Sequence, residues 1–282
     1  MQTIEKLDEL FAEADLILSD VWGVVHNGEW SFPAAAAALK RAREAGKTVV
    51  LITNSPRPRE GVITQLGALG VPEDAWDGVV TSGDVTRDLI NASARKVFHI
   101  GTDRDLPIYE STHAELVEEQ EAQVVVCTGL FDDEVEKPED YAPLLQRLRA
   151  RSLPFICANP DIVVERGERL IFCAGAIARE YGLLGGRTLV AGKPHSPIYE
   201  LAFREGDALH GKPVDKSRIL AIGDGLLTDV KGAINNDCAL LYISAGIHAR
   251  EYGEHGRPDS ARLAAWLNHH GVKPRATMPH LV

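Results

Sequence analysis

Four polar residues stand at the carboxyl ends of short, largely apolar runs, where buried strands are expected to end. The runs and their polar residues are LILS before Asp20, TVVLIT ending in Thr53, TLVAG before Lys193 and ILAIG before Asp224. If the four strands lie side by side in one parallel sheet, their carboxyl ends converge at one edge. Ligands bind at that edge in open sheets of this kind. The pattern therefore predicts one crevice that gathers these side chains.

The residue types gathered there favour phosphate chemistry. Asp229, five residues after Asp224, would add a third carboxylate. Neighbouring carboxylates repel one another unless a cation joins them, and hard oxygen ligands suit Mg²⁺, which also binds substrate phosphate. The Lys193 ammonium and the Thr53 hydroxyl would hold phosphoryl oxygens, while a carboxylate in line with phosphorus can act as a covalent nucleophile. We therefore infer phosphoryl transfer.

Each of these residues also has a purely structural interpretation. Aspartate at a strand end or in the first turn of a helix commonly caps the helix or complements its dipole. That would account for Asp20, Asp224 and Asp229 taken singly, and Lys193 taken alone could be a solvated loop lysine. The order of the four segments favours the chemical interpretation over these.

A dinucleotide-binding loop is a further alternative, because GDGLLT at 223–228 follows a strand and opens a helix. Two features argue against it. Thr228 stands in place of the third glycine, and Asp224 would direct a negative charge at the pyrophosphate.

Strand-like runs alternate with amphipathic helical segments along the chain. Helices are predicted over about 33–45, 59–67, 141–151, 175–181, 197–208, 227–235 and 260–270. Residues 4–14 also show helical spacing, and the tail 271–282 shows no periodicity. The alternation predicts an α/β fold with a doubly wound parallel sheet. From residue 78 strand-like and helical segments continue to alternate, and we expect them to form a separate α/β unit.

The composition argues against several classes of protein. The 282 residues include 41 acidic and 30 basic side chains, for a formal charge of -11, and no Lys or Arg run that would follow a nucleic-acid backbone. No apolar stretch approaches the roughly 18 to 20 residues that span a bilayer, and the acidic N-terminus does not resemble a signal peptide. We therefore expect a cytoplasmic protein with no nucleic-acid and no membrane partner. Four cysteines stand singly in largely apolar stretches and are expected to be structural thiols: Cys127, Cys157, Cys173 and Cys238.

Four short motifs, in this order, resemble those of the haloacid dehalogenase superfamily. They are DVWGVV at 20–25, LITNS at 51–55, AGKP at 191–194 and IGDGLLTDV at 222–230. FICANPD at 155–161 and FCAGAIA at 172–178 resemble part of the cap domain that one class of the superfamily inserts between the second and third motifs. Within that class the chain is most similar to the 4-nitrophenylphosphatase-like subfamily, along essentially its whole length.

This resemblance implies a Rossmann-like core of residues 1–78 and 187–282 with an inserted, smaller α/β cap of residues 79–186. It also implies a site for Mg²⁺. Asp224 would bind the metal directly, together with Asp20 and the backbone carbonyl of Trp22. Asp229 would lie behind Asp224 and orient the metal's waters or Lys193.

The resemblance also implies that Asp20 attacks phosphorus and that Thr53 and Lys193 assist it. The residues expected to contact substrate are Thr53, Asn54, Ser55, Lys193, Asn159, Asp161 and His26. Lys193 would neutralise the charges of Asp20 and phosphate, and Thr53 would bind phosphoryl oxygens together with the amide of Asn54. Asn159 and Asp161 would lie on a cap loop that faces the site and selects the leaving group. A plain Asn-Pro-Asp turn is an equally simple interpretation of that loop.

Trp22 departs from the usual pattern, which has a second aspartate two residues after the nucleophile as general acid and base. General acid–base catalysis is typically worth about 10² to 10⁴ in rate. Three interpretations follow. His26 or the cap supplies the proton, the substrate has a leaving group that needs none, or the activity is vestigial. His26 lies in a glycine-containing loop and has an ordinary pKa of about 6.5, although a loop histidine is more often only solvated.

The leading hypothesis is a magnesium-dependent phosphatase that hydrolyses a small cytoplasmic phosphomonoester through an aspartyl-phosphate on Asp20. A closed cap would exclude macromolecules, so the expected partner is a phosphorylated metabolite. The alternative is a catalytically weak or inactive phosphate-binding protein, which Trp22 favours and Asp20 opposes. Cleavage of a carbon–phosphorus or carbon–halogen bond is a third option that fits the magnesium chemistry less well. A homodimer is possible, since cap-to-cap dimers are common in similar proteins.

Overall fold

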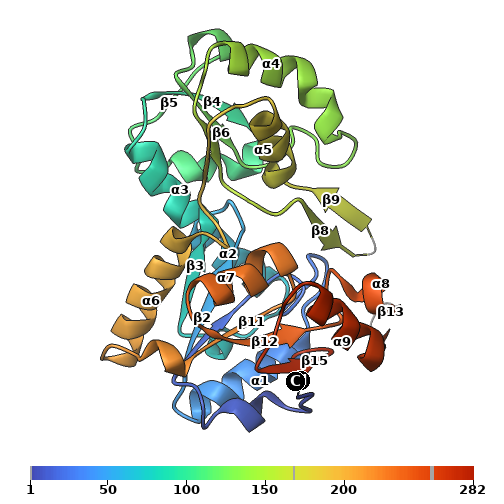
Figure 1. Ribbon diagram of the computed structural model, residues 1–282. Helices are drawn as coiled ribbons and strands as arrows, with labels where there is room; N and C mark the ends of the chain where they lie inside the picture. Colours follow the sequence, from blue (N-terminus) through green and yellow to red (C-terminus); the bar gives the residue numbers. More distant parts are fainter. Residues whose placement is uncertain (1, 168, 255–256) are drawn as a thin grey trace. The chain divides into compact units, whose positions relative to one another are not determined.

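The computed structural model describes residues 2–167, 169–254 and 257–282. The chain divides into two compact units. The first contains Met1–Thr53, Ile63–Val80 and Tyr199–Val282, and the second contains Asn54–Val62 and Thr81–Ile198. Each unit has its own parallel sheet flanked by helices (Figure 1), which confirms the expected α/β class. The predicted boundaries of core and cap stay a prediction.

The first unit is built on a sheet that, within the described residues, has six strands in the order β15-β12-β11-β1-β2-β3. They are β1 (Leu16–Ser19), β2 (Thr48–Thr53), β3 (Gly78–Thr81), β11 (Ile219–Gly223), β12 (Ala239–Ile243) and β15 (Ala276–Met278). Strand β1 pairs in parallel with β2 on one side and β11 on the other. The carboxyl ends of these three strands therefore meet at one edge of the sheet.

The helices of the first unit follow the sequence pattern closely. They are α1 (Pro33–Glu44), α7 (Lys231–Asn235), α8 (Ala249–Tyr252) and α9 (Ser260–His269), and two more, α2 (Arg59–Ala68) and α6 (Ser196–His210), cross from the second unit into the first. Proline opens α1, and its buried residues Ala35, Ala38 and Ala42 recur at helical spacing, so one face packs into the core. The chain leaves α1 through Gly46 at φ +79°, a conformation that glycine adopts without strain.

Shorter elements complete the first unit. They are the 3-10 helices Leu7–Leu10, Glu73–Ala75 and Lys216–Arg218, a π-helical turn at Leu226–Val230, and the paired strands β13 (Gly253–Glu254) and β14 (Arg257–Pro258). The helical spacing over residues 4–14 gives only the single turn at 7–10. The predicted helix over 227–235 is divided between the π-helical turn and α7.

The second unit has a sheet of five strands across the residues that the structure describes, in the order β10-β7-β6-β4-β5. They are β4 (Lys96–Ile100), β5 (Glu115–Leu116), β6 (Val124–Cys127), β7 (Phe155–Cys157) and β10 (Thr188–Val190), with a separate hairpin of β8 (Val163–Arg166) and β9 (Arg169–Phe172). Its helices are α3 (Ser82–Asn91), α4 (Ala142–Ala150) and α5 (Ala174–Leu183), with 3-10 helices at Asp103–Tyr109, Glu119–Glu121 and Pro138–Tyr141.

The core of the second unit includes a stacked pair of rings, Phe155 of β7 and Tyr181 of α5, whose centroids are 5.0 Å apart. The Tyr181 hydroxyl is satisfied because it donates to the carbonyl oxygen of Leu153 at 2.6 Å. Cys127, Cys157 and Cys173 are buried thiols, as expected, and Cys238 of the first unit is partly buried. Burial raises the pKa of the Cys157 thiol to about 12, so this thiol is unreactive at neutral pH.

Strand β10 does not belong to the sheet in which the sequence pattern predicts it. The run before Lys193 was expected beside the strands that precede Asp20, Thr53 and Asp224, but β10 pairs with β7 in the sheet of the second unit. The expectation that all four strands share one sheet is therefore wrong for this strand. A run such as TLV packs equally well at the edge of either sheet, so local sequence cannot choose between them.

None of the helices formed by the described residues is both long enough and apolar enough to cross a membrane.

Candidate active site

Three aspartates meet at the carboxyl edge of the first unit's sheet. Asp20 follows β1, Asp224 follows β11, and Asp229 lies on the π-helical turn after β11. One carboxylate oxygen from each lies within 4.8 Å of the others. The three residues are only 6%, 5% and 4% exposed, respectively. We call these three residues the aspartate cluster.

The pairing of β1 with β11 places Asp20 beside Asp224. Ser19 is paired with Ile222, and the amide of Asp20 donates to the carbonyl oxygen of Ile222 at 2.8 Å. Asp20 is therefore level with Gly223, the last residue of β11, and Asp224 follows directly after it at the same edge of the sheet. The sequence predicted this convergence, because adjacent parallel strands end at one edge.

The π-helical turn sets the position of Asp229. The amide of Val230 donates to the carbonyl oxygen of Gly225 at 3.0 Å, which closes the wide turn. The amide of Gly225 in turn donates to Oδ2 of Asp229 at 3.1 Å. Such turns are rare and occur frequently at functional sites. The turn brings the Asp229 carboxylate back to the end of β11.

Glycines let the backbone approach these carboxylates. A Cβ atom at Gly246 would lie 1.9 Å from Oδ2 of Asp224, one at Gly23 would lie 2.5 Å from the same oxygen, and one at Gly223 would lie 2.2 Å from Cγ of Asp229. Gly23 also has φ +85°, which disfavours other residues. Any side chain at these positions would displace a carboxylate.

The segment after β12 is a part of the site that the sequence reasoning missed. The amide of Ile247 donates to Oδ2 of Asp224 at 2.8 Å, directly after Gly246. The only signal in the sequence was a glycine shortly after a predicted strand, and many loops share that feature.

The aspartate cluster fits a hard divalent cation. Three buried carboxylates at this separation repel one another, and a cation that accepts oxygen ligands relieves the repulsion. Elsewhere in the described part of the chain, no other three His, Cys, Asp or Glu side chains come together in this way. The donor set contains only oxygen atoms, which suits magnesium-like ions better than zinc.

Trp22 and His26 form one packed unit beside the cluster. Their rings meet edge to face with centroids 5.0 Å apart. Gly28, at φ +90°, makes room for the indole, since a Cβ there would lie 2.5 Å from Cζ2 of Trp22. The indole is therefore fixed against the loop backbone.

His26 is buried, not solvated in a flexible loop. Its exposure is 2%, and its Nδ1 accepts a hydrogen bond from the amide of Gly28 at 2.9 Å. Burial lowers the pKa of His26 to about 4. The imidazole is then neutral at neutral pH, which disfavours the hypothesis that His26 protonates a leaving group.

A second group of expected site residues comes together in the second unit. Oδ1 of Asn54 accepts from the amide of Lys193 at 2.7 Å, while Nδ2 of Asn54 donates to Oδ1 of Asp161 at 2.9 Å. Oδ1 of Asn159 accepts from the amide of Asp161 at 3.1 Å. The Asn54 side chain thus links the loop at 159–161 to the backbone of Lys193. The Lys193 side chain is itself 2% exposed.

Two more expected residues lie at the end of β2 and just beyond it. Thr53 is the last residue of β2 and is buried. Ser55 uses its hydroxyl oxygen to accept from the amide of Arg57 at 3.3 Å, and its carbonyl oxygen accepts from the amide of Gly83. The Ser55 hydroxyl therefore shapes the turn into α2.

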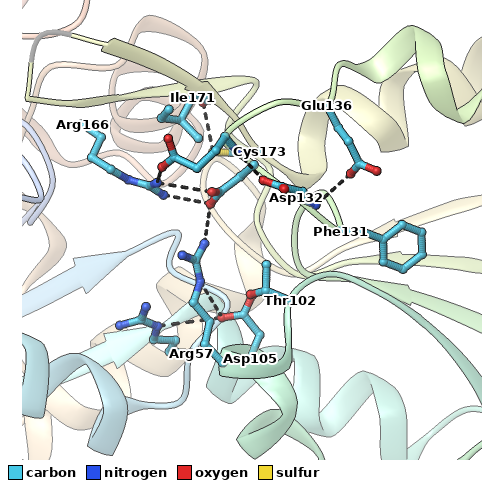
Figure 2. Close-up of polar contacts among 12 residues, drawn as sticks. Arg57, Thr102, Asp105, Phe131, Asp132, Glu136, Arg166, Ile171 and Cys173 are labelled. Atoms are coloured by element: carbon cyan, nitrogen blue, oxygen red, sulfur yellow. Dashed lines mark hydrogen bonds and ion pairs between the residues drawn. The ribbon is translucent and has the colours of Figure 1, made fainter.

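A second carboxylate-rich region lies in the second unit, where arginines alternate with acids (Figure 2). This arginine ladder consists of Arg57, Asp105, Arg104, Asp133, Arg166, Glu134 and Arg169. Nη2 of Arg166 lies 2.8 Å from Oδ2 of Asp133, and Nε of Arg57 lies 3.8 Å from Oδ1 of Asp105. The ladder joins the hairpin β8–β9 to the loop at 131–137 and to the segment after β4.

Comparison with known proteins agrees with the fold. Residues 17–115 match a family described as haloacid dehalogenase-like hydrolase, and residues 190–272 match a related hydrolase-like family. A crystal structure of a hydrolase of the haloacid dehalogenase-like family from Brucella suis 1330 is 61% identical, covers 99% of this chain and 100% of its own, and superposes with a TM-score of 0.90.

Curated relatives are more distant. The 4-nitrophenylphosphatase of Schizosaccharomyces pombe is 23% identical over 271 residues, which cover 86% of this chain and 88% of the relative. The glycerol-3-phosphate phosphatase of Homo sapiens is 26% identical over 266 residues, which cover 80% and 77%. The fold and site thus define an α/β hydrolase with a buried carboxylate centre. The chain belongs to the haloacid dehalogenase-like hydrolase family, which confirms the resemblance noted in the sequence.

Proposed function

We propose that this protein is a magnesium-dependent phosphatase that hydrolyses a small phosphomonoester through an aspartyl-phosphate on Asp20. The observation that carries the proposal is the aspartate cluster, in which three buried carboxylates lie within 4.8 Å of one another at the carboxyl edge of the sheet. The names of the family's phosphatases support the same reaction class.

Asp20 is the nucleophile of this proposal. One of its carboxylate oxygens attacks phosphorus, and the bond to the ester oxygen breaks with its electron pair leaving on that oxygen. Water then attacks the phosphorus of the aspartyl-phosphate, and the bond from phosphorus to the Asp20 oxygen breaks with its electron pair left on the carboxylate. The released phosphate keeps the oxygen of the water and takes up its proton. Asp20 and Asp224 would hold Mg²⁺ together with the carbonyl oxygen of Trp22, and Asp229 would orient its waters. When bound, the ion lowers the repulsion between Asp20 and the phosphate.

Thr53 and Lys193 complete the proposed mechanism on the phosphoryl side. The Thr53 hydroxyl and the amide of Asn54 would donate to phosphoryl oxygens, and the Lys193 ammonium would balance the charge that develops in the transition state. The hydrogen bonds of the Asn54 side chain to Lys193 and Asp161 give it a positioning role. Asn159, Asp161 and Ser55 would shape the space for the leaving group.

The rate of ester cleavage at this site depends on the leaving group. The indole N–H of Trp22 is far too weak an acid to protonate a leaving alkoxide, and the buried His26, with a pKa of about 4, is neutral at neutral pH. We therefore propose that the natural substrate is a metabolite whose leaving group departs without full protonation, such as an aryl or acyl phosphate. We expect the enzyme to be cytoplasmic, and we propose a homodimer as its oligomeric state.

A second candidate is a catalytically weak phosphate-binding protein. Trp22 favours this candidate, because an indole in place of the general acid lowers the rate by about 10² to 10⁴ for poor leaving groups. The two candidates differ in whether Asp20 is used as a nucleophile.

A substrate panel separates these candidates. Wild type, Asp20→Asn and Trp22→Asp would be assayed with 4-nitrophenyl phosphate, an acyl phosphate and several alkyl phosphates, with and without Mg²⁺. We expect turnover of the aryl and acyl esters, a loss of at least about 10³-fold in kcat for Asp20→Asn, and a gain on alkyl esters for Trp22→Asp. Wild type that binds phosphate and Mg²⁺ but turns over no ester would favour the binding protein.

A further inference from the structure

Two consecutive residues after β12 form hydrogen bonds to two points of the segment that carries Asp224 and Asp229. The amide of Ile247 donates to Oδ2 of Asp224 at 2.8 Å. Nε2 of the next residue, His248, accepts from the amide of Leu226 at 3.2 Å. Leu226 is the first residue of the π-helical turn. Ile247 and His248 therefore hold this segment at the Asp224 carboxylate and at the first amide of the π-helical turn.

His248 is itself oriented by a second carboxylate. Its Nδ1 lies 2.6 Å from Oε1 of Glu251, and the other oxygen of Glu251 accepts from Nε1 of Trp266 at 2.7 Å. Because the Leu226 amide can only donate, Nε2 of His248 must accept, and the ring proton must lie on Nδ1 facing Glu251. Trp266 also packs on the His248 ring, with centroids 5.2 Å apart. The imidazole is thus fixed in tautomer and in direction.

The Leu226 amide is a critical point of the turn. It lies two residues after Asp224 and three residues before Asp229, within a turn that closes through Val230 and Gly225. Rotation of the peptide before Leu226 would move Gly225, whose own amide holds Oδ2 of Asp229. A bond at Leu226 therefore limits the relative motion of two carboxylates at once.

We propose that His248, oriented by Glu251, is a positioning residue that fixes the separation of the Asp224 and Asp229 carboxylates for a divalent cation. The inference rests on the proposed function, since it assumes that the aspartate cluster binds Mg²⁺. His248 acts on the cluster through the backbone of Leu226. Side chains that orient metal ligands from behind typically contribute about 10- to 100-fold in metal affinity.

A set of four variants tests this role. His248→Leu removes the acceptor, while His248→Gln offers an amide oxygen to Leu226 in its place. Glu251→Gln keeps the size of the partner but removes its charge. His269→Leu is the matched control, because His269 is exposed at the end of α9 and its ring contacts the ring of His270.

The main measurement is the Kd for Mg²⁺, obtained by calorimetry on the full chain without substrate. We expect His248→Leu to raise this Kd about tenfold, Glu251→Gln to raise it less, His248→Gln to recover part of the loss, and His269→Leu to match wild type. In assays with 4-nitrophenyl phosphate, the activity lost by His248→Leu should return at saturating Mg²⁺. A residue that only stabilised the fold would lower the melting temperature of the metal-free protein without this dependence on Mg²⁺.

The outcomes separate the inference from the function beneath it. A His248→Leu variant that folds and binds Mg²⁺ as wild type does would overturn the positioning role alone. If His248→Leu does not fold, unchanged Mg²⁺ affinity in both His248→Gln and Glu251→Gln would overturn it. Wild type that binds no Mg²⁺ would overturn the inference and the proposed function together. A shifted Mg²⁺ affinity in a protein that hydrolyses no ester would support the positioning role and contradict the phosphatase.

Discussion

The aspartate cluster and the arginine ladder hold carboxylates through different contacts. In the ladder, full positive charges face the acids. Burial raises the pKa of Asp133, but hydrogen bonds and charges from Arg166 and Arg104 outweigh it and leave this pKa below its ordinary value. In the cluster, the contacts to Asp224 and Asp229 include the backbone amides of Ile247 and Gly225. Amides orient a carboxylate without bringing a full positive charge to it.

This difference indicates different uses of the same chemical group. A carboxylate paired with guanidinium groups has its charge compensated within the fold, so it serves to join segments. In the cluster, amides direct the Asp224 and Asp229 carboxylates so that one oxygen from each of the three aspartates lies within 4.8 Å of the others, a grouping that suits a cation. We therefore propose that the ladder serves structure and the cluster serves chemistry, although both are rich in acids. Three experiments test this distinction.

The largest effect is expected from Gly246→Ala. The added Cβ would lie 1.9 Å from Oδ2 of Asp224, so the carboxylate or the loop must move. Displacement of a reacting group by about 1 Å can cost about 10²-fold in rate, and we expect a comparable loss of kcat/KM together with weaker binding of Mg²⁺. Gly67→Ala, in α2 of the same chain, is the control because nothing lies within 4 Å of its Cβ. Unchanged Mg²⁺ affinity in Gly246→Ala would show that the cluster does not bind the metal.

A moderate effect on stability, without an effect on chemistry, is expected from Asp133→Asn. The change would leave Arg104 and Arg166 facing a neutral amide in a largely buried position, which we expect to cost about 1 to 3 kcal/mol of unfolding free energy. Urea unfolding measures this cost, with Asp88→Asn, an exposed change on α3, as the control. Mg²⁺ affinity should stay at the wild-type value. A loss of Mg²⁺ affinity equal to that of Gly246→Ala would contradict the division of roles.

The sequence predicted the cluster better than it predicted its surroundings. Asp20 and Asp224 follow strands whose apolar runs are unmistakable, and parallel pairing of neighbouring strands is enough to bring the two together. Lys193 also follows a strand-like run, but the choice of sheet for β10 depends on contacts distant in sequence. Strand identity is thus a local property, whereas strand partnership is not.

The other features that the sequence did not predict also depend on contacts between residues distant in sequence. His26 stands among glycine and asparagine, a composition typical of exposed loops, yet the bulk of Trp22 packs against it and buries it. The tail has no periodicity, because β15 is a three-residue strand at the edge of the sheet. The hydrogen bonds of Ile247 and His248 to the segment 224–226 join residues more than twenty positions apart. Patterns within a short window carry no information about such contacts.

The smallest effect on stability is expected from Asp15→Asn. Asp15 represents a third arrangement, in which a carboxylate at the surface of the first unit pairs with a guanidinium group. Asp15 pairs with Arg218 just before β1 and β11 begin, and the two side chains are 32% and 39% exposed. The hydrogen bond from Arg218 lowers the pKa of Asp15 to about 2. Because both groups are well solvated, we expect Asp15→Asn to cost less than about 1 kcal/mol at neutral pH.

The pH dependence of that cost distinguishes pairing from burial. A carboxyl whose pKa is lower in the folded state stabilises the fold above its unfolded pKa of about 3.9, and this stabilisation is lost as the pH falls toward the folded value of about 2. The free-energy difference between wild type and Asp15→Asn should therefore shrink between about pH 6 and about pH 3 in urea unfolding, and it should shrink in high salt as well. If Asp15→Asn instead costs as much as Asp133→Asn and that cost shrinks in high salt, an exposed ion pair is worth as much as a ladder pair, and burial among the segments that the ladder joins adds nothing.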